Sequence, residues 1–324
     1  MIPKAELHVH LEGTAPPHLV RTLAKRNRVS LPIDLFQDDG AFHWRDFNHF
    51  LEVYDAASSV IKTPEDYRDV TYAYLAACAA EGAVYVEVMS SPDHAAAAGM
   101  TYRDHLDGIV AGIADAAADH GIVGRLIVTC VRHFGTDQAM KVARQVVAHP
   151  HEFVVGFGMG GDEANWPPGQ FADAFNHVAA SGLPCTVHAG EWAGPERIRE
   201  AIATLPIVRL GHGVRAIEDP ALVEEIVARG IALEVCPGSN VATGLYETLA
   251  KHPLQRLIDA GVSVSINSDD PPYFATSIGR EYDNAVSAMG LSSASLLQIT
   301  QAAIAASFAD PATKAQLQTS IVRP

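Results

Sequence analysis

Short apolar runs rich in valine and isoleucine recur along the chain, and segments with a helical pattern separate them. We predict eight β-strands from these runs: Glu6–Leu11, Ala83–Ser91, Arg125–Val131, Phe153–Gly160, Pro184–Gly190, Val208–Val214, Ala232–Pro237 and Val262–Asp269. Their nearly continuous hydrophobicity is typical of strands that are covered on both faces, as in parallel sheets.

Between these runs, apolar residues recur with the 3.6-residue period of amphipathic helices. Asp137–His149 shows the pattern clearly, with Val142 and Val146 one helical turn apart. Further helices of this kind are predicted at Gln170–Ser181, Pro195–Leu205, Asp219–Arg229 and Leu254–Ala260. A last helix, Ser292–Phe308, has a serine at its predicted N-cap.

Eight strands that alternate with helices predict a single α/β domain over residues 1–324, a (β/α)8 TIM barrel. An open, doubly wound sheet is the alternative, but it would leave exposed edge strands. Three helical patterns lie between the first two strands, at Pro17–Arg28, Arg45–Ile61 and Pro64–Glu81. We therefore predict that residues 12–82 form a helical insertion that caps the mouth of the barrel.

Composition indicates a globular domain and disfavours two classes of partner. Apolar residues make up 48% of the chain and charged residues 19%, which is ordinary for a domain with a sizeable core. A formal net charge of −15 repels phosphate backbones and anionic lipids, so nucleic acid and membranes are poor partners. No signal-peptide pattern is visible, and the four cysteines form no CxxC pair, so we expect buried free thiols in a cytoplasmic protein.

Chemically active side chains gather where the predicted strands end, which is where the active sites of such barrels lie. Four strands carry them: His8 and His10 on the first, His188 and Glu191 at the fifth, His212 on the sixth, and Asp269 and Asp270 at the eighth. Because side chains alternate along a strand, His8 and His10 would point the same way. The other histidines, such as His18, His49, His94 and His252, are expected in loops or on helix faces, mostly solvated.

A divalent metal would explain this concentration of groups at one rim. Burying four histidines and an aspartate there without partners would cost several kcal/mol. The imidazoles of His8, His10 and His188 and the carboxylate of Asp269 form a donor set that suits zinc, with iron or cobalt as substitutes. An open position on the ion would hold water, whose pKa the metal lowers to about 7. We expect one zinc ion per chain.

Four segments, "PKAELHVHLEGT", "HAGE", "LGHGVRA" and "SINSDDP", resemble in this order the diagnostic motifs of the adenosine/adenine deaminase family of the amidohydrolase superfamily. The resemblance extends from Pro3 to about Asn284. It implies hydrolytic deamination of a 6-aminopurine, with zinc bound by the residues named above. The catalytic residues that it implies are Glu191, His212 and Asp269, and the substrate-binding residues are His10, Glu12, Gly161 and Asp270.

The resemblance also implies a role for each of these side chains. Glu191 would protonate N1 of the purine, and His212 with Asp269 would orient and activate the attacking water. Asp270 would bond to N7, and the backbone N–H of Gly161 would bond to N3. Glu12 stands where adenosine-specific members carry an aspartate that contacts the ribose.

Different motifs indicate different substrates. "HLEGT" and "SDDPPYF" resemble members that act on free adenine, whereas "GGDE" and "LGHGV" resemble members that act on adenosine. We expect adenosine or deoxyadenosine, giving inosine and ammonia. The alternative is free or N6-substituted adenine, giving hypoxanthine.

Other classes of zinc protein fit the sequence less well. Two-metal barrel hydrolases usually bridge their ions with a lysine or carboxylate at the end of the fourth strand, and Phe153 to Gly161 contains neither. Cytidine-deaminase-type sites need a Pro-Cys-x-x-Cys motif, which is missing. A non-catalytic zinc barrel is the remaining alternative, although structural zinc sites are closed and lack spare acids.

Overall fold

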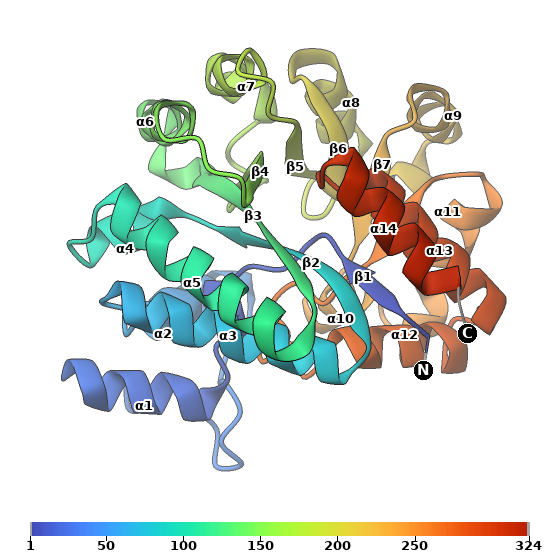
Figure 1. Ribbon diagram of the computed structural model, residues 1–324. Helices are drawn as coiled ribbons and strands as arrows, with labels where there is room; N and C mark the ends of the chain where they lie inside the picture. Colours follow the sequence, from blue (N-terminus) through green and yellow to red (C-terminus); the bar gives the residue numbers. More distant parts are fainter. Residues whose placement is uncertain (1, 323–324) are drawn as a thin grey trace.

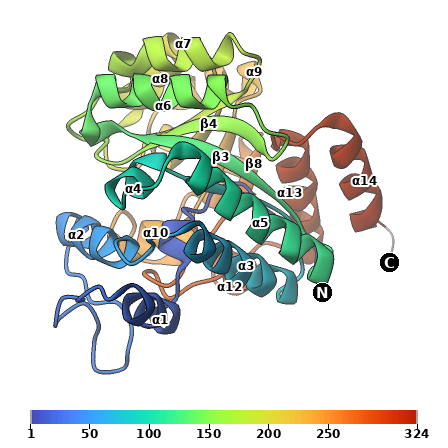
Figure 2. The same cartoon turned by 60° about the vertical axis from the view of Figure 1, so that its left-hand side comes forward.

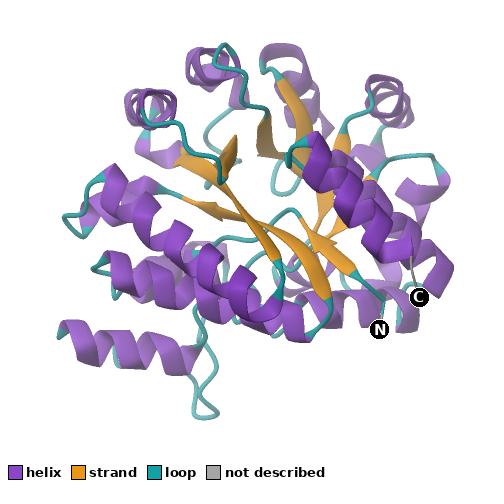
Figure 3. Cartoon of the chain, viewed as in Figure 1, coloured by secondary structure: helices purple, strands orange, loops and turns teal. Residues whose placement is uncertain are grey.

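Eight parallel strands form a barrel at the centre of the molecule, and helices surround it (Figures 1 and 3). The computed structural model describes residues 2–322. The strands are β1 (Lys4–Glu6), β2 (Ala83–Ser90), β3 (Val123–Val131), β4 (Val154–Gly160), β5 (Cys185–Ala189), β6 (Ile207–His212), β7 (Ala232–Val235) and β8 (Val264–Ile266). They pair in sequence order from β1 to β8. The predicted (β/α)8 barrel is confirmed.

The barrel closes between β8 and β1 through a side chain and an isolated bridge. The side-chain Oδ1 of Asn267 accepts the backbone N–H of Leu7 at 2.8 Å. Beyond this point Val9 forms a parallel bridge with Asp269. Because a side chain replaces the backbone partner, no continuous ladder forms here.

Two predicted strand boundaries are therefore wrong. The first strand ends at Glu6 rather than Leu11, so His8 and His10 follow the strand instead of lying within it. The eighth ends at Ile266, so Asp269 lies in the turn after β8, with a φ of +65°.

Fourteen α-helices lie outside the barrel within the described residues. They are α1 (Pro17–Asn27), α2 (Phe47–Ser58), α3 (Pro64–Ala80), α4 (Pro92–Ala97), α5 (Tyr102–His120), α6 (Thr136–Ala148), α7 (Ala172–Ala179), α8 (Pro195–Thr204), α9 (Pro220–Arg229), α10 (Pro237–Ala242), α11 (Leu254–Asp259), α12 (Ile278–Ser287), α13 (Ser293–Ala306) and α14 (Pro311–Val322). The sequence pattern did not predict α4, α5, α10, α12 and α14. The helices α4 and α10 have only six residues each, so their sequences span less than two turns and give a weak periodic signal.

Helix α5 was missed because glycines interrupt its apolar pattern. A Cβ on Gly108 would lie 2.4 Å from the carbonyl oxygen of Pro64 at the start of α3. The glycine therefore lets α5 pack closely against α3, at the cost of a weaker helical signal.

Helices α1, α2 and α3 lie between β1 and β2 in the sequence, and α2 reaches the mouth of the barrel. Its residues Phe47, Phe50, Leu51, Tyr54 and Asp55 line the pocket described below. In both views α1 lies at the periphery, beyond α2 and α3 (Figures 1 and 2).

The interior agrees with the predictions from composition. All four cysteines are buried and free. Among residues 2–322, no helix combines the length and hydrophobicity required to cross a bilayer.

Candidate active site

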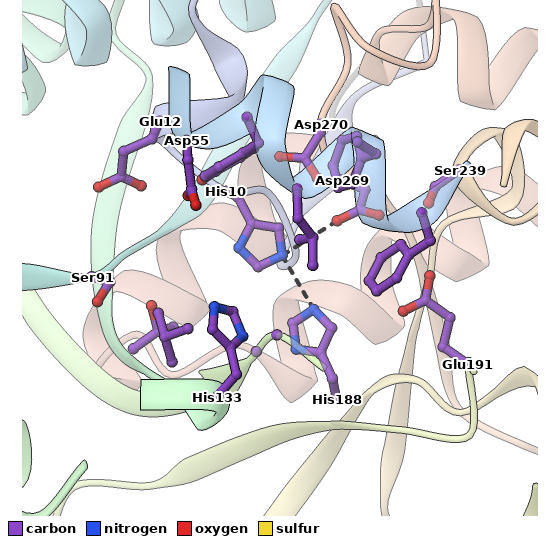
Figure 4. Close-up of a pocket in the computed structure, with 18 of the residues that line it drawn as sticks. His10, Glu12, Asp55, Ser91, His133, His188, Glu191, Ser239, Asp269 and Asp270 are labelled. Carbon is purple, nitrogen blue, oxygen red and sulfur yellow. Dashed lines mark hydrogen bonds and ion pairs between the residues drawn. The ribbon is translucent and has the colours of Figure 1, made fainter. Parts of the chain in front are cut away.

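A pocket at the carboxyl ends of the strands brings together nearly all of the predicted site residues (Figure 4). The predicted residues that line it are His10, Glu12, Gly161, His188, Glu191, His212, Asp269 and Asp270. His8 is the exception, because it is completely buried and does not reach the pocket surface.

The four predicted metal donors form one cluster. The ligand atoms of His8, His10, His188 and Asp269 all lie within 4.8 Å of one another. The Nε2 atoms of His8 and His10 lie 3.6 and 3.4 Å from Oδ1 of Asp269. The two Nε2 atoms of His10 and His188 face each other at 3.1 Å.

Hydrogen bonds at Nδ1 of His8 and of His188 leave the Nε2 atom of each ring free to bind a metal ion. Nδ1 of His8 donates to the carboxylate of Glu234 (2.7 Å), and Nδ1 of His188 donates to the carbonyl of Met159 (2.9 Å). Nε2 of each neutral ring therefore carries a lone pair. Nε2 of His8 is buried without any hydrogen-bond partner, and a bound cation would satisfy it.

The electrostatics favour a neutral imidazole at two of the three histidines. Desolvation lowers the pKa of His188 well below its ordinary value and that of His10 to about 4. At His8 the carboxylates of Asp269 and Glu234 outweigh burial and raise the pKa to about 10, so a metal ion would take the place of the proton on Nε2. Nitrogen and carboxylate donors in this arrangement fit zinc.

A second cluster of potential donors contains His8, His212, Cys236 and Asp269. Cys236 is completely buried and does not line the pocket, and its thiol donates to the carbonyl of Glu234 (3.6 Å). In the first cluster, by contrast, His10, His188 and Asp269 all line the pocket. The first cluster is therefore the better metal site.

Glu191 and Asp270 are buried acids next to this cluster. Burial raises the pKa of Glu191 well above its ordinary value, and the negative charges of Asp269 and Glu163 add to the effect. Burial likewise raises the pKa of Asp270, whose Oδ1 has no hydrogen-bond partner. Both side chains can therefore carry a proton at neutral pH and donate it to a ligand.

Two of the non-glycine site residues have left-handed backbone conformations. The φ angles are +56° at His212 and +65° at Asp269. Such conformations cost about 1–3 kcal/mol each and concentrate at functional sites. Here they turn the chain at the ends of β6 and β8 where both side chains enter the pocket.

Close packing explains the glycine at position 161. Its φ is +95°, and a Cβ there would lie 2.7 Å from Nδ1 of His133. A side chain at this position would also narrow the pocket, because both residues line it.

Glu12 is fixed at the end of the pocket opposite Glu191 (Figure 4). It is only 2% exposed, and its Oε1 accepts hydrogen bonds from Ser90 Oγ (2.6 Å) and Tyr67 OH (3.2 Å). Because Ser90 donates to Glu12, Nε2 of His105 must donate to the Ser90 hydroxyl (2.7 Å). Three side chains thus hold Glu12 in one orientation.

Several buried polar residues that hold the site residues in place were not predicted from the sequence. Glu163 accepts the backbone N–H groups of residues 190 to 193, Glu234 orients His8, and Asn240 lies against His212. The run "IALEV" offered one signal, since Glu234 is the lone acid in an otherwise apolar predicted strand.

The expectation that His252 is solvated is wrong: it is 6% exposed and bonds to Asn240. His94, which was also expected to be solvated, lines the pocket, and its side chain is 19% exposed.

An eight-stranded barrel with histidine and aspartate donors at its strand ends and buried acids beside them is typical of metal-dependent hydrolases. The family model for adenosine deaminase matches residues 3–324, and the chain belongs to this family. The family predicted from the four motifs is confirmed, and the match extends beyond them to the end of the chain.

Comparison with individual proteins agrees with this assignment. The chain is 45% identical over 317 residues to a protein named adenine deaminase from Chelativorans sp. (strain BNC1), covering 98% of this chain and 97% of the relative. The crystal structure of adenine deaminase from Arthrobacter aurescens superposes with a TM-score of 0.92 at 33% identity, covering 99% and 98% of the two chains. An amidohydrolase from Burkholderia ambifaria with bound Zn gives a TM-score of 0.90 at 27% identity, covering 99% and 90%. The chain is a metal-dependent deaminase that acts on small purines.

Proposed function

We propose that this enzyme hydrolyses free adenine to hypoxanthine and ammonia. The observation that carries the proposal is its similarity, over nearly the whole chain, to proteins named adenine deaminase. This similarity favours the alternative substrate given above over adenosine, which was the main expectation.

The position of Glu12 supports a free base as the substrate. Its carboxylate is one methylene longer than the aspartate of adenosine-specific members, and Ser90 and Tyr67 prevent it from swinging away. We infer that Glu12 occupies the space that a ribose on N9 would need. A carboxylate there can accept a hydrogen bond from an imidazole N–H of adenine, which adenosine lacks at N9.

The charge of the pocket argues against nucleotides. Five acids line it: Glu12, Asp55, Glu191, Asp269 and Asp270. Among the described residues that line the pocket there is neither lysine nor arginine. A phosphate group would therefore enter without a cationic partner and close to several carboxylates.

The chain's own residues can divide the reaction between them. His8, His10, His188 and Asp269 would hold a zinc ion, which supplies a Lewis acid that makes a water molecule more acidic. Glu191 would give its proton to N1 while oxygen adds to C6, so that the ring accepts the electron pair. Of the two protons of the attacking water, one would pass to N6 and the other would restore the acid form of Glu191. The C6–N6 bond then breaks, and N6 leaves as ammonia.

The other pocket residues would orient the base. Protonated Asp270 would donate to N7, and the backbone N–H of Gly161 would donate to N3. Together with the contact of Glu191 to N1, these hydrogen bonds would bind three ring nitrogens and hold C6 near the metal.

Steady-state kinetics on one zinc-loaded preparation would test the proposal. We expect kcat/KM for adenine to exceed that for adenosine at least tenfold, with AMP the poorest substrate and N6-methyladenine included as a probe of the space near C6. A preference for adenosine of tenfold or more would overturn the adenine assignment and leave the deaminase reaction standing.

A further inference from the structure

A chain of buried hydrogen bonds leads from the pocket into the segment that follows β7. At its far end, the backbone N–H of Leu254 donates to Nδ1 of His252 (3.2 Å). A backbone N–H can only donate, so Nδ1 of His252 carries no proton. Burial also lowers the pKa of His252 to about 3, and the neutral ring must therefore carry its proton on Nε2.

That proton determines the orientation of the next residue. Nε2 of His252 lies 3.2 Å from Oδ1 of Asn240 and donates to it. The amide nitrogen of Asn240 then faces Nδ1 of His212 at 3.1 Å and donates to it in turn. His212 accepts at Nδ1, so its own proton is on Nε2.

This series of hydrogen bonds can be satisfied in one direction only, with Leu254 donating to His252, His252 to Asn240 and Asn240 to His212. If the Asn240 amide were flipped, its N–H2 would face the Nε2–H of His252, and two donors would meet. Moving the His252 proton to Nδ1 would relieve that contact but would oppose it to the N–H of Leu254. His212, Asn240 and His252 are all buried, so water cannot supply the missing partner.

We propose that Asn240 and His252 are positioning residues that hold His212 in its Nε2–H form, so that His212 presents a hydrogen-bond donor to the reacting centre. Nε2 lies 3.5 Å from Oε2 of Glu191 and 3.8 Å from Oδ2 of Asp269, between the two catalytic carboxyl groups. From there it can donate to the oxygen that adds to C6. It has no lone pair with which to take a proton from the attacking water, so it can orient that water but cannot act as its base. The inference rests on the deaminase reaction and not on the choice of purine.

Nitrogen NMR of histidine-labelled, zinc-loaded enzyme tests the proposal directly. In the wild type we expect His212 to show an unprotonated Nδ1 and a protonated Nε2. In Asn240→Asp a carboxylate accepts from both neighbouring rings, so the His212 proton should move to Nδ1. A protonated Nδ1 on His212 in the wild type would overturn the proposal.

Kinetics of the same variants add a second readout. An incorrect histidine tautomer costs about 10⁴-fold in kcat in serine proteases. We expect Asn240→Asp to lower kcat ~10²-fold or more by analogy, with KM and zinc content close to wild type. An Asn240→Asp enzyme with wild-type kcat and full zinc would overturn the proposal.

Variants at position 252 separate the hydrogen bond from packing. His252→Leu removes the donor to Asn240 and should lower kcat. His252→Gln restores an N–H donor and should recover most of that loss. Tyr246→Phe is the matched control, because its ring lies against that of His252, with centroids 5.0 Å apart, but it takes no part in the chain. Equal kcat losses in all three variants would show that only packing matters and would overturn the proposal. The nitrogen spectrum does not depend on the substrate, so its result is distinct from a failure of the adenine assignment.

Discussion

The carboxylate of Glu163 accepts a hydrogen bond from the backbone N–H of Glu191 at 3.1 Å. It also accepts those of Gly190 (2.5 Å), Trp192 (2.8 Å) and Ala193 (3.2 Å). One buried side chain therefore holds the whole turn that presents Glu191 to the pocket. Its negative charge also contributes, after burial and Asp269, to the raised pKa of Glu191.

Glu163→Gln should lower kcat by about tenfold or more, because an amide N–H2 would face backbone donors and displace Glu191. Loss of the charge should also lower the pKa of Glu191. Since the protonated acid is the active form, activity should then disappear at a lower pH than in the wild type. Glu200→Gln is the control, because Glu200 accepts one backbone N–H, from Gly169, at the surface. A Glu163→Gln enzyme whose kcat and pH profile matched this control would contradict the role.

Removal of a predicted ligand should remove the metal. We expect His188→Ala to lose most of its zinc and nearly all activity, because three remaining donors bind the ion much less tightly. His133→Ala should keep about one zinc per chain, since His133 lines the pocket but belongs to neither donor cluster. Elemental analysis of both proteins checks this, and two tightly bound ions in the wild type would contradict the single site.

Glu191→Gln should keep its zinc, because the side chain is outside the donor clusters. It cannot donate a proton to N1, so kcat should fall ~100-fold or more, the usual contribution of a positioned acid. A kcat within a few-fold of wild type, measured by the change in purine absorbance, would reduce Glu191 to a structural residue.

Glu12→Asp should shift specificity toward the nucleoside. The shorter side chain vacates space at the end of the pocket and withdraws the carboxylate from the base. We expect kcat/KM for adenine to fall and the ratio of adenosine to adenine to rise about tenfold. Leu51→Val also shortens a side chain in the pocket lining, so it is the control for an effect of added pocket volume alone. An unchanged ratio in Glu12→Asp would remove Glu12 from substrate selection.

Glu281 should make stability depend on pH. It is fully buried, and burial raises its pKa from 4.5 to about 7, although it accepts hydrogen bonds from Thr276 and Gly238. The folded state prefers the neutral form, so this contribution is fully present below about 4.5 and is lost as pH rises through about 7. The loss is of the order of 3 kcal/mol. The Tm of the wild type should fall relative to Glu281→Gln between pH 5 and pH 8, and a constant difference would contradict the shift.

Much of the fold followed from local patterns in the sequence. A strand covered on both faces needs a continuous apolar run, so β2 to β7 were located to within a few residues. The candidate site was equally visible, because residue types that can bind metals and move protons stand at strand ends, as His188 and His212 do. In a parallel barrel all strand ends meet at one rim, so these side chains had to converge.

What the sequence could not determine is which buried groups become partners. Glu163 bonds to a turn 27 residues away, and Glu234 orients a histidine 226 residues away. The ends of β1 and β8 likewise depend on Asn267, whose side-chain oxygen takes the place of a backbone carbonyl and accepts the N–H of Leu7, 260 residues away. A residue's type limits which bonds it can make, but only the folded backbone brings donor and acceptor together and excludes water. For the same reason, only the tertiary structure shows the series of hydrogen bonds from Leu254 through His252 and Asn240 to His212, on which the proposed tautomer depends.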